Sequence, residues 1–242
     1  MKIVADMHTH TNVSAHAFSS LDEMVRGARD AGLRAIAITN HGPAMKDGAH
    51  QWHFGNMGII PRVMHGVTVI RGIECNILPP DGALDRMEGW CYNALDYVIA
   101  SFHEPCFPPV NAEVHTAALE NILKNPRVQC FGHLGNPNYP FDQEFIISRC
   151  NEYGKIVEIN NNSVNARKGS EGNCIEIARL CKKYGVPVMV SSDSHISYKV
   201  GGFDNALGVL AAVDFPEKLV INADFDRLVE YFRLARKMDI TK

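Results

Sequence analysis

The chain has 242 residues, with 24 Lys and Arg against 27 Asp and Glu, so its formal net charge is −3. Hydrophobic residues make up 46% of the sequence, which is typical of a packed protein and excludes a disordered one. The mild negative charge argues against a nucleic-acid coat and against a polybasic membrane binder. Histidine is prominent, with 11 residues.

The N-terminus and the cysteines predict a cytoplasmic protein. Asp6 comes too early for a secretory signal peptide, and no apolar run reaches the ~18 residues of a membrane span. The seven cysteines are scattered without a C-x-x-C pair. We therefore expect buried small side chains in a reducing compartment rather than disulfides or a cysteine metal site.

Short runs rich in Val and Ile predict buried strands. In chain order they are Ile3–Asp6, Ala35–Thr39, Val67–Ile73, Tyr97–Phe102, Val128–Gly132, Ile156–Asn160 and Val186–Ser191. No linker or repeat divides residues 1–242, so we expect one domain. Seven strands that alternate with helices predict an α/β fold in which a parallel sheet closes into a barrel.

Capping and stop signals predict the helices between these strands. The first helix follows a capping box of Ser20 and Glu23 and stops at Gly32. The others are expected at Glu113–Lys124, Asp142–Gly154, Ser170–Gly185, Asp204–Val213 and Asp226–Lys237. The segment Gly42–Gly66 is aromatic and lacks clear periodicity, so we expect a long loop with a functional role or with structure that periodicity does not reveal.

Six of the seven predicted strands run into His, Asp or Glu. The residues at these ends are Asp6, His8, His10, His41, Glu74, His103, His133, Asp193 and His195. The carboxyl ends of parallel barrel strands meet at one rim, where active sites form. Because side chains alternate along an extended segment, His8 and His10 share one face, as do Asp193 and His195.

Imidazole and carboxylate groups in this pattern predict a metal centre. A lone histidine after a strand is usually an ordinary surface or core residue, but solvated histidines have no reason to recur at strand ends. Zn²⁺, Mn²⁺ and Fe²⁺ favour such mixed ligands. Seven histidines and two carboxylates would serve at most two or three ions, and Glu74 is suited to bridging two of them.

Several separated motifs resemble the PHP (polymerase and histidinol phosphatase) superfamily over the whole chain. They are Asp6–Thr11, Thr39–Gly42, Gly72–Glu74, Phe102–Pro105, Gly132–His133 and Ser192–His195. The resemblance narrows to the stand-alone YcdX-type phosphatase branch at Phe18-Ser19, Trp52-His53-Phe54, Asn160–Ser163 and Arg167–Glu171. One departure is Asn40, where many members carry Asp before the histidine; we expect it to tune His41.

The resemblance implies a distorted seven-stranded TIM-like (β/α)7 barrel with three divalent ions, zinc foremost and manganese or iron as alternatives. It assigns the first ion to His8, His10, Glu74 and Asp193. It assigns the second to Glu74, His103 and His133. It assigns the third to His16, His41 and His195. Glu74, Asp193 and His195 would be the catalytic ligands, and Asp6 would orient its neighbours.

Other residues suggest additional roles near this rim. Arg167 and Lys168 precede a helix start, an arrangement suited to binding substrate phosphate. Four histidines lie outside the ligand scheme. His50 and His53 fall in the aromatic loop and either line the pocket mouth or pack locally, whereas His65 and His115 are expected to be exposed helix or turn residues.

These features predict a phosphoric ester hydrolase that cleaves small phosphate monoesters with a metal-activated hydroxide and no covalent nucleophile. One alternative is a phosphodiesterase or exonuclease acting on nucleotide or short oligonucleotide ends. Another is an amidohydrolase, although the bridging lysine common there is replaced by Glu74. A non-enzymatic metal-storage or sensor protein is the third. The expected partner is a small phosphorylated substrate, not a membrane or a long nucleic acid. The sequence does not decide whether the chain forms a homo-oligomer.

Overall fold

The computed structural model describes residues 1–242 and contains a nearly closed barrel of seven parallel strands. The barrel strands lie in the order β1 (Ala5–Thr9), β2 (Ala35–Ile38), β4 (Val67–Leu78), β6 (Tyr97–Ser101), β7 (Cys130–Phe131), β8 (Ile156–Asn160) and β9 (Val188–Ser191). Two short strands, β3 (Val63–Met64) and β5 (Ala83–Leu84), pair antiparallel with β4. The predicted α/β barrel is confirmed.

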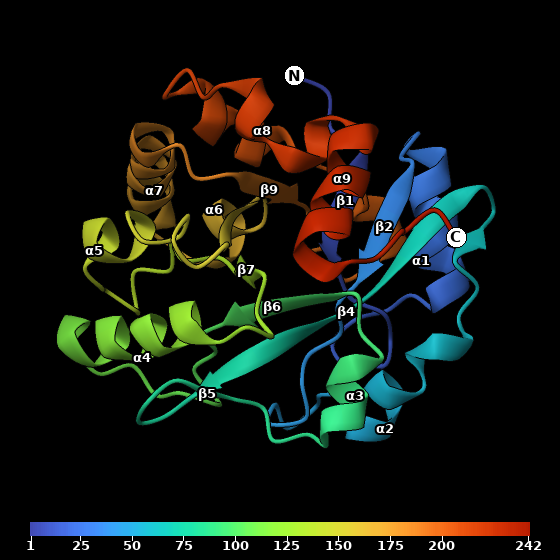
Figure 1. The fold of residues 1–242 in the computed structure, drawn as a ribbon, viewed down its shortest axis with the longest axis horizontal. Coiled ribbons are helices and arrows are strands. Elements are labelled where there is room, and N and C mark those ends of the chain that lie inside the picture. The colour runs from blue at the N-terminus through green and yellow to red at the C-terminus, as the bar shows by residue number, and fades with distance from the viewer.

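Helices surround the strands, as Figure 1 shows. The α-helices are α1 (Leu21–Asp30), α2 (Gln51–Gly55), α3 (Gly89–Asn93), α4 (Ala112–Lys124), α5 (Gln143–Ile147), α6 (Ser163–Ala166), α7 (Ser170–Tyr184), α8 (Asp204–Ala211) and α9 (Phe225–Arg236). Single 3₁₀ turns are η1 (Met57–Ile59), η2 (Ser197–Lys199), η3 (Glu217–Leu219) and η4 (Ile221–Ala223). None of these helices has the length and apolarity needed to cross a membrane.

Side chains that point into the barrel change from apolar to polar along each strand. In β4, Ile70 belongs to the inner apolar cluster, and Glu74 lies four residues further on the same face. In β8 the buried Glu158 lies two residues after Ile156, on the same face of the strand. The floor of the site is therefore a continuation of the barrel core, which α9 closes at the opposite end with Phe232 and its neighbours.

A β-bulge in β1 brings successive side chains of this strand to the inside. Asp6 pairs with Ile36 and Thr9 with Ile38, so two residues of β1 face the single residue between them on β2. Met7 packs in the inner apolar cluster, and His8 also reaches the barrel interior. The bulge changes the simple alternation expected from the sequence while keeping His8 and His10 close together.

The seam between β1 and β9 is closed by a side chain rather than by a full strand ladder. The only bridge between the two segments joins Thr9 and Ser194. The buried Asn222 lies at the seam; its amide group donates to the carbonyls of Ala5 and Val190 at 2.7 Å, and its oxygen accepts from the Val190 amide at 3.0 Å. One asparagine thus replaces backbone pairing between the start of β1 and β9.

Several predicted helices have the expected ends. The capping box of Ser20 and Glu23 is present before α1, and Gly32 follows that helix with φ +72°. The helix expected from Asp142 to Gly154 is wrong in length, because α5 ends at Ile147 and irregular turns continue to Gly154. The short helix α5 packs against α4 and α7.

The segment Gly42–Gly66 is not a structureless loop, because it contains α2, η1 and β3. The strand expected at Val67–Ile73 also continues to Leu78, where it pairs with β5. Glu74 therefore lies within a strand rather than at its end. The sequence periodicity missed these short elements because each depends on pairing or packing with a distant segment.

Candidate metal centre

All nine predicted donor residues converge at the carboxyl ends of the barrel strands. They are His8 in β1, His10 and His16 after it, His41 after β2, Glu74 in β4, His103 after β6, His133 after β7, and Asp193 and His195 after β9. Six separate segments of the chain thus contribute to one cluster.

The first group contains His8, His10, Glu74 and Asp193. Nε2 of His8 lies 3.0 Å from Nε2 of His10, and Asp193 Oδ1 lies 3.6 and 3.3 Å from these two atoms. Glu74 Oε2 lies 3.3 and 3.5 Å from the same two nitrogens. Tetrahedral ligands at 2.0–2.1 Å from a zinc ion are separated by about 3.3 Å, so this spacing suits one shared ion.

The second group forms around the other oxygen of Glu74. Glu74 Oε1 lies 2.8 Å from Nε2 of His133 and 3.3 Å from Nε2 of His103. His41 also faces this carboxylate, with Nδ1 2.8 Å from Oε2. Glu74 therefore presents one oxygen to each of two groups, the geometry of a carboxylate that bridges two ions.

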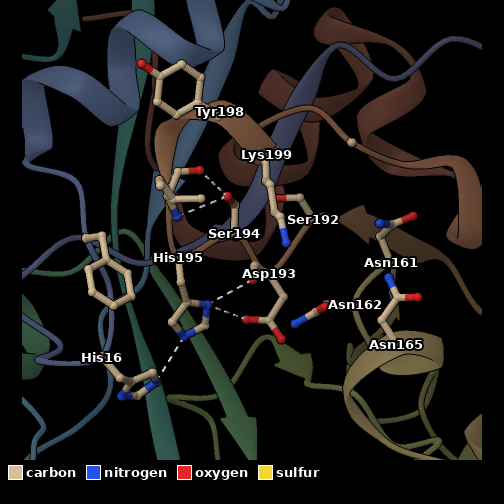
Figure 2. Close-up of a pocket in the computed structure, with 13 residues that line it drawn as sticks. His16, Asn161, Asn162, Asn165, Ser192, Asp193, Ser194, His195, Tyr198 and Lys199 are labelled. Carbon is tan, nitrogen blue, oxygen red and sulfur yellow. Dashed lines mark hydrogen bonds and ion pairs between the residues drawn. The ribbon is translucent and has the colours of Figure 1, made fainter.

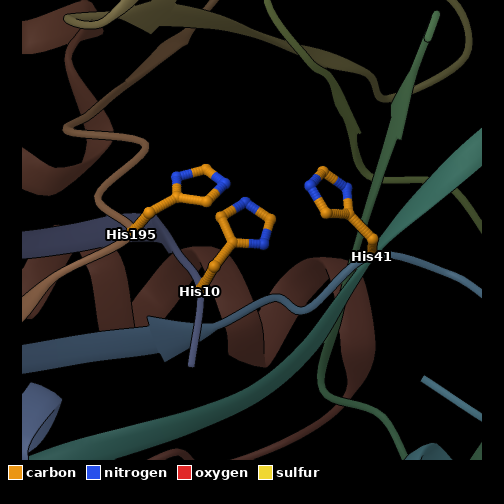
Figure 3. A group of neighbouring side chains, drawn as sticks. All are labelled: His10, His41 and His195. Atoms are coloured by element: carbon orange, nitrogen blue, oxygen red, sulfur yellow. The ribbon is translucent and has the colours of Figure 1, made fainter. Parts of the chain in front are cut away.

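The third group is the most accessible. Nε2 of His16 lies 3.2 Å from Nε2 of His41 and 3.0 Å from Nε2 of His195. Figure 3 shows the rings of His10, His41 and His195 lying together, and the His10 ring stacks on each of the other two at a centroid distance of 4.3 Å. His41 has one nitrogen toward this group and the other toward Glu74, so it lies between two candidate positions.

Three buried atoms of the cluster have no hydrogen-bond partner within the protein. They are Oε2 of Glu74, Nδ1 of His10 and Nδ1 of His41; the first and the last lie 2.8 Å apart without forming a hydrogen bond. Buried polar atoms are normally paired, so unpaired ones that face a shared space indicate ligand atoms. The donor set fits one or more bound divalent cations.

Buried negative charge leads to the same conclusion. Burial acts to raise the pKa of Glu74 and Asp193, but the surrounding histidines hold both pKa values well below the usual range. Burial acts to lower the pKa of His8, whereas Glu74, Glu158 and Asp193 raise it well above the usual value. Adjacent buried carboxylates need positive charge nearby, and a divalent ion supplies it without protonating the donors.

Glu158 is a site residue that the sequence reading missed. Nδ1 of His8 donates to its Oε1 at 2.7 Å, and its Oε2 accepts from the His133 amide at 2.6 Å. Ser191 donates a further short hydrogen bond to Oε1. A carboxylate that binds one ring nitrogen of a histidine fixes the tautomer and directs the other nitrogen to the cluster. The sequence signal for Glu158 was a charged residue at an inward position of an otherwise apolar strand.

Two other missed residues orient histidines in the same way. Asn76 Oδ1 accepts from Nδ1 of His103 at 2.8 Å, and Asp47 Oδ2 accepts from Nδ1 of His16 at 2.5 Å. In both cases Nε2 is left facing the cluster. Asp47 lies in the segment expected to be a loop, where no periodic pattern marked it.

Asp6 and Asn40 act on backbone segments rather than on the donor rings. Asp6 accepts from the amides of Ser192 and Gly201 at 3.0 Å, which holds the segment bearing Asp193 and His195. Asn40 accepts from the Thr11 amide at 2.8 Å. Ser14 links Asn40 to His41, because its hydroxyl donates to Asn40 Oδ1 at 3.4 Å and accepts from the His41 amide at 3.1 Å.

The backbone is in the left-handed region at two donor positions, His133 with φ +29° and Asp193 with φ +55°. Non-glycine residues rarely adopt this conformation, and such strain concentrates at functional sites. At both positions the chain turns sharply after a strand, which directs the side chain into the barrel mouth.

Arg167 and Lys168 lie beside the cluster, between α6 and α7. Nη2 of Arg167 lies 3.8 Å from Asp193 Oδ2, and its Nη1 is buried without a partner. Both residues line a pocket of about 420 Å³ together with His103 and Asn138. A second pocket, of about 640 Å³, opens over Asp193, His195 and His16 (Figure 2). The cluster thus has a pocket on each side.

Of the four histidines outside the ligand scheme, His115 differs from its expected place. It is fully buried; Nδ1 donates to the Pro140 carbonyl at 2.8 Å, and Nε2 accepts from the Val110 amide at 3.0 Å. The prediction of an exposed residue is wrong because the histidine side of α4 packs against the loops after β6 and β7. His65 is in an exposed turn, as expected.

His50 and His53 pack locally. Nδ1 of His50 accepts from the Trp52 amide and caps α2, and Nε2 of His53 accepts from the Asn40 side chain at 3.2 Å. Neither lines the two pockets beside the cluster. Of the two roles left open for these histidines, local packing is the one observed.

These features define a TIM-like α/β barrel with a candidate metal centre at the carboxyl ends of its strands. The family model described as the PHP domain matches residues 6–162. The chain belongs to the PHP family.

Curated relatives agree over nearly the whole chain. It is 47% identical over 233 residues to a probable phosphatase of Acetivibrio thermocellus, covering 96% of each chain. It is 43% identical over 239 residues to a probable phosphatase of Clostridium acetobutylicum, covering 98% of each.

Solved structures share the fold at low sequence identity. Histidinol phosphate phosphatase from Lactococcus lactis, solved with zinc, L-histidinol and phosphate, has a TM-score of 0.62 at 16% identity, covering 89% of this chain and 95% of that one. A chain in the cryo-EM structure of archaeal ribonuclease P with mature tRNA has a TM-score of 0.58 at 11% identity, covering 96% and 91%. At these identities the likeness concerns the fold alone.

Proposed function

We propose that residues 1–242 form one catalytic domain, a metal-dependent phosphatase that hydrolyses small phosphate monoesters at three divalent metal ions. The observation that carries the proposal is the division of the buried donors into groups that share the two oxygens of Glu74. The probable phosphatases at 43–47% identity support the reaction class. The zinc in the histidinol phosphate phosphatase structure supports zinc as the first metal to test, before manganese and iron.

The residues would hold the ions as follows. His8, His10, Glu74 and Asp193 would bind the first. Glu74, His103 and His133 would bind the second. His16, His41 and His195 would bind the third. Bound divalent ions supply Lewis-acid activation of water and neutralise phosphoryl charge.

The remaining chemistry belongs to side chains of the chain itself. Arg167 has an unpaired buried nitrogen beside Asp193, which suits it to a phosphate oxygen close to the cluster. Lys168 adds a second, more exposed positive charge in the same pocket. Glu158, Asn76 and Asp47 hold the imidazole rings in place, so the donor atoms need little rearrangement.

The test is a phosphate-release screen of small esters on protein whose metal content is measured by elemental analysis. We expect at least two metal equivalents per chain. Glu74→Ala and Asp193→Ala should reduce turnover by at least roughly 10²–10³-fold, because each removes charge at the reacting centre. Glu171→Ala, an exposed carboxylate on α7, is the matched control.

Undiminished activity in either purified Ala variant, or fewer than two metal equivalents, contradicts the proposal. Turnover of an oligonucleotide in preference to a monoester would reassign the site to a phosphodiesterase. Metal binding without any turnover would favour a metal-storage or sensor protein.

A further inference from the structure

The larger of the two pockets beside the metal cluster has a polar lining, and its floor is formed by Asp193, His195 and His16. Its volume of about 640 Å³ far exceeds that of a phosphate group, and only three of its 13 lining residues are hydrophobic. Figure 2 shows the walls: η2 carries Lys199 on one side, and the segment after β8 carries Asn162 and Asn165 on the other.

The asparagines of this segment have different functions, although they are nearly adjacent in sequence. Asn160 donates to Asp193 Oδ2 at 3.2 Å, which orients a predicted metal ligand. Asn161 accepts from the amides of Asn205 and Ala206 and thereby binds the first turn of α8. Structural roles account for both of these side chains.

Asn162 and Asn165 have no such partners. Asn162 is the N-cap residue that precedes α6, yet its side chain makes no capping bond, and neither amide forms a side-chain hydrogen bond within the protein. Lys199, across the pocket, forms no ion pair. Two amides and one ammonium group therefore face the space above the cluster with free donors and acceptors.

We infer that this pocket binds the alcohol part of the substrate, and that this alcohol is polyhydroxylated, as in a sugar phosphate; the inference rests on the proposed phosphatase function. Amides both donate and accept, and an ammonium donates, so the three groups match several hydroxyls at once. Arg167 and Lys168 line the other pocket, so the two sides of the cluster separate phosphate binding from alcohol binding.

A nucleoside fits this lining less well. Recognition of a base relies on stacking between aromatic rings. Figure 2 shows the Tyr198 ring directed away from Asp193 and His195, and Tyr198 is 93% exposed. Phe18, the other aromatic residue of the lining, is 77% exposed, so neither ring is packed in place as a stacking platform beside the amides.

The experiment compares kcat/KM for ribose 5-phosphate and glucose 6-phosphate with kcat/KM for p-nitrophenyl phosphate. In the metal-loaded wild type, at least one sugar phosphate should be preferred. Asn162→Ala and Asn165→Ala should each lower the ratio of sugar-phosphate to aryl-phosphate kcat/KM by about 3- to 10-fold, and Lys199→Met by about 10-fold. The effect is specific to the alcohol, since the phosphate is common to both substrates.

Asn93→Ala and Lys218→Ala are matched controls at exposed positions outside both pockets, and they should leave the ratio unchanged. The inference is overturned if the pocket variants leave the ratio unchanged, which includes an equal fall in kcat/KM for both substrates. It is also overturned if the wild type prefers a nucleoside monophosphate and the variants abolish that preference. No hydrolysis of any ester by the metal-loaded wild type would overturn the proposed function itself, and the inference with it.

Discussion

At the scale of single residues, the candidate centre depends on side chains that hold the donor groups as much as on the donors. His8 illustrates this, because one ring nitrogen faces Glu74 and Asp193 while the other is bound to Glu158. The same arrangement recurs at His103 with Asn76 and at His16. Preorganised rings lose little freedom when a metal binds.

Glu158→Gln tests this role. The amide preserves shape but cannot accept from both His8 and the His133 backbone as a carboxylate does. We expect metal affinity to fall about 10- to 100-fold. Competition with a chelator of known affinity measures it. Glu171→Gln is the control, and equal affinity in the two variants would contradict the role.

Lys155 gives a prediction about pH at the far end of β8. Its buried Nζ donates to the carbonyls of Asn125 and Val128, and burial lowers the pKa of Lys155 from 10.5 to about 8. Between pH 8 and about 10.5 the unfolded chain holds a proton that the folded chain has released, so stability should rise with pH in this window. Below pH 8 both the folded and the unfolded chain carry the proton, so the stability no longer changes with pH through Lys155.

Comparison with Lys155→Met isolates that effect from other titrating groups. The thermal midpoint of the wild type, relative to the variant, should rise from pH 8 to pH 10. Lys218→Met, an exposed lysine, should show no such trend. A difference between wild type and Lys155→Met that is constant with pH would rule the effect out.

At the scale of elements, the seam between β1 and β9 is the weak point of the barrel. Backbone pairing there is limited to the bridge between Thr9 and Ser194, and Asn222 supplies the hydrogen bonds that a longer ladder would make. Because β1 and β9 carry donors of the first group, this closure also sets the width of the site.

Asn222→Ala should destabilise the fold by about 2–4 kcal/mol, because it leaves buried backbone groups of Ala5 and Val190 without partners. Urea denaturation measures the change, with Asn93→Ala as the exposed control, expected within about 0.5 kcal/mol of wild type. A loss no larger than that of the control would show that the seam does not depend on this side chain.

At the scale of the whole molecule, buried carboxylates from β4, β8 and the end of β9 meet inside one barrel mouth. Bound cations would offset the repulsion among them, so metal binding should stabilise the entire fold rather than one loop.

Removal of metal by a chelator should therefore lower the thermal midpoint. One site at 100 times its Kd contributes about 2.7 kcal/mol, or roughly 5–10 °C for a chain of this size. Zinc or manganese should restore the loss, as thermal melts at several metal concentrations would show. Glu74→Gln should lose a large part of this response. An identical midpoint with and without chelator would contradict metal binding at the cluster.

Much of the fold was predictable from local signals. The Val- and Ile-rich runs marked all seven barrel strands, and the box of Ser20 and Glu23 marked the first helix. Short elements such as β3 and β5 were missed because they exist only through pairing with β4. His115 was misplaced because burial of a polar ring depends on partners, Val110 and Pro140, that local sequence does not indicate.

The sequence by itself determined which side chains reach the barrel mouth. Strand periodicity and parallel order place His8, Glu74, His133 and Asp193 at one rim whatever the details of packing. The family resemblance implied how these donors divide into groups, whereas the tertiary structure alone decided the distances between them and which residues orient them. Distances of about 3 Å between atoms of Glu74 and of histidines on other strands depend on the β1 bulge, the seam at Asn222 and the left-handed turns. These features arise from contacts between segments distant in the chain, and no local pattern encodes them.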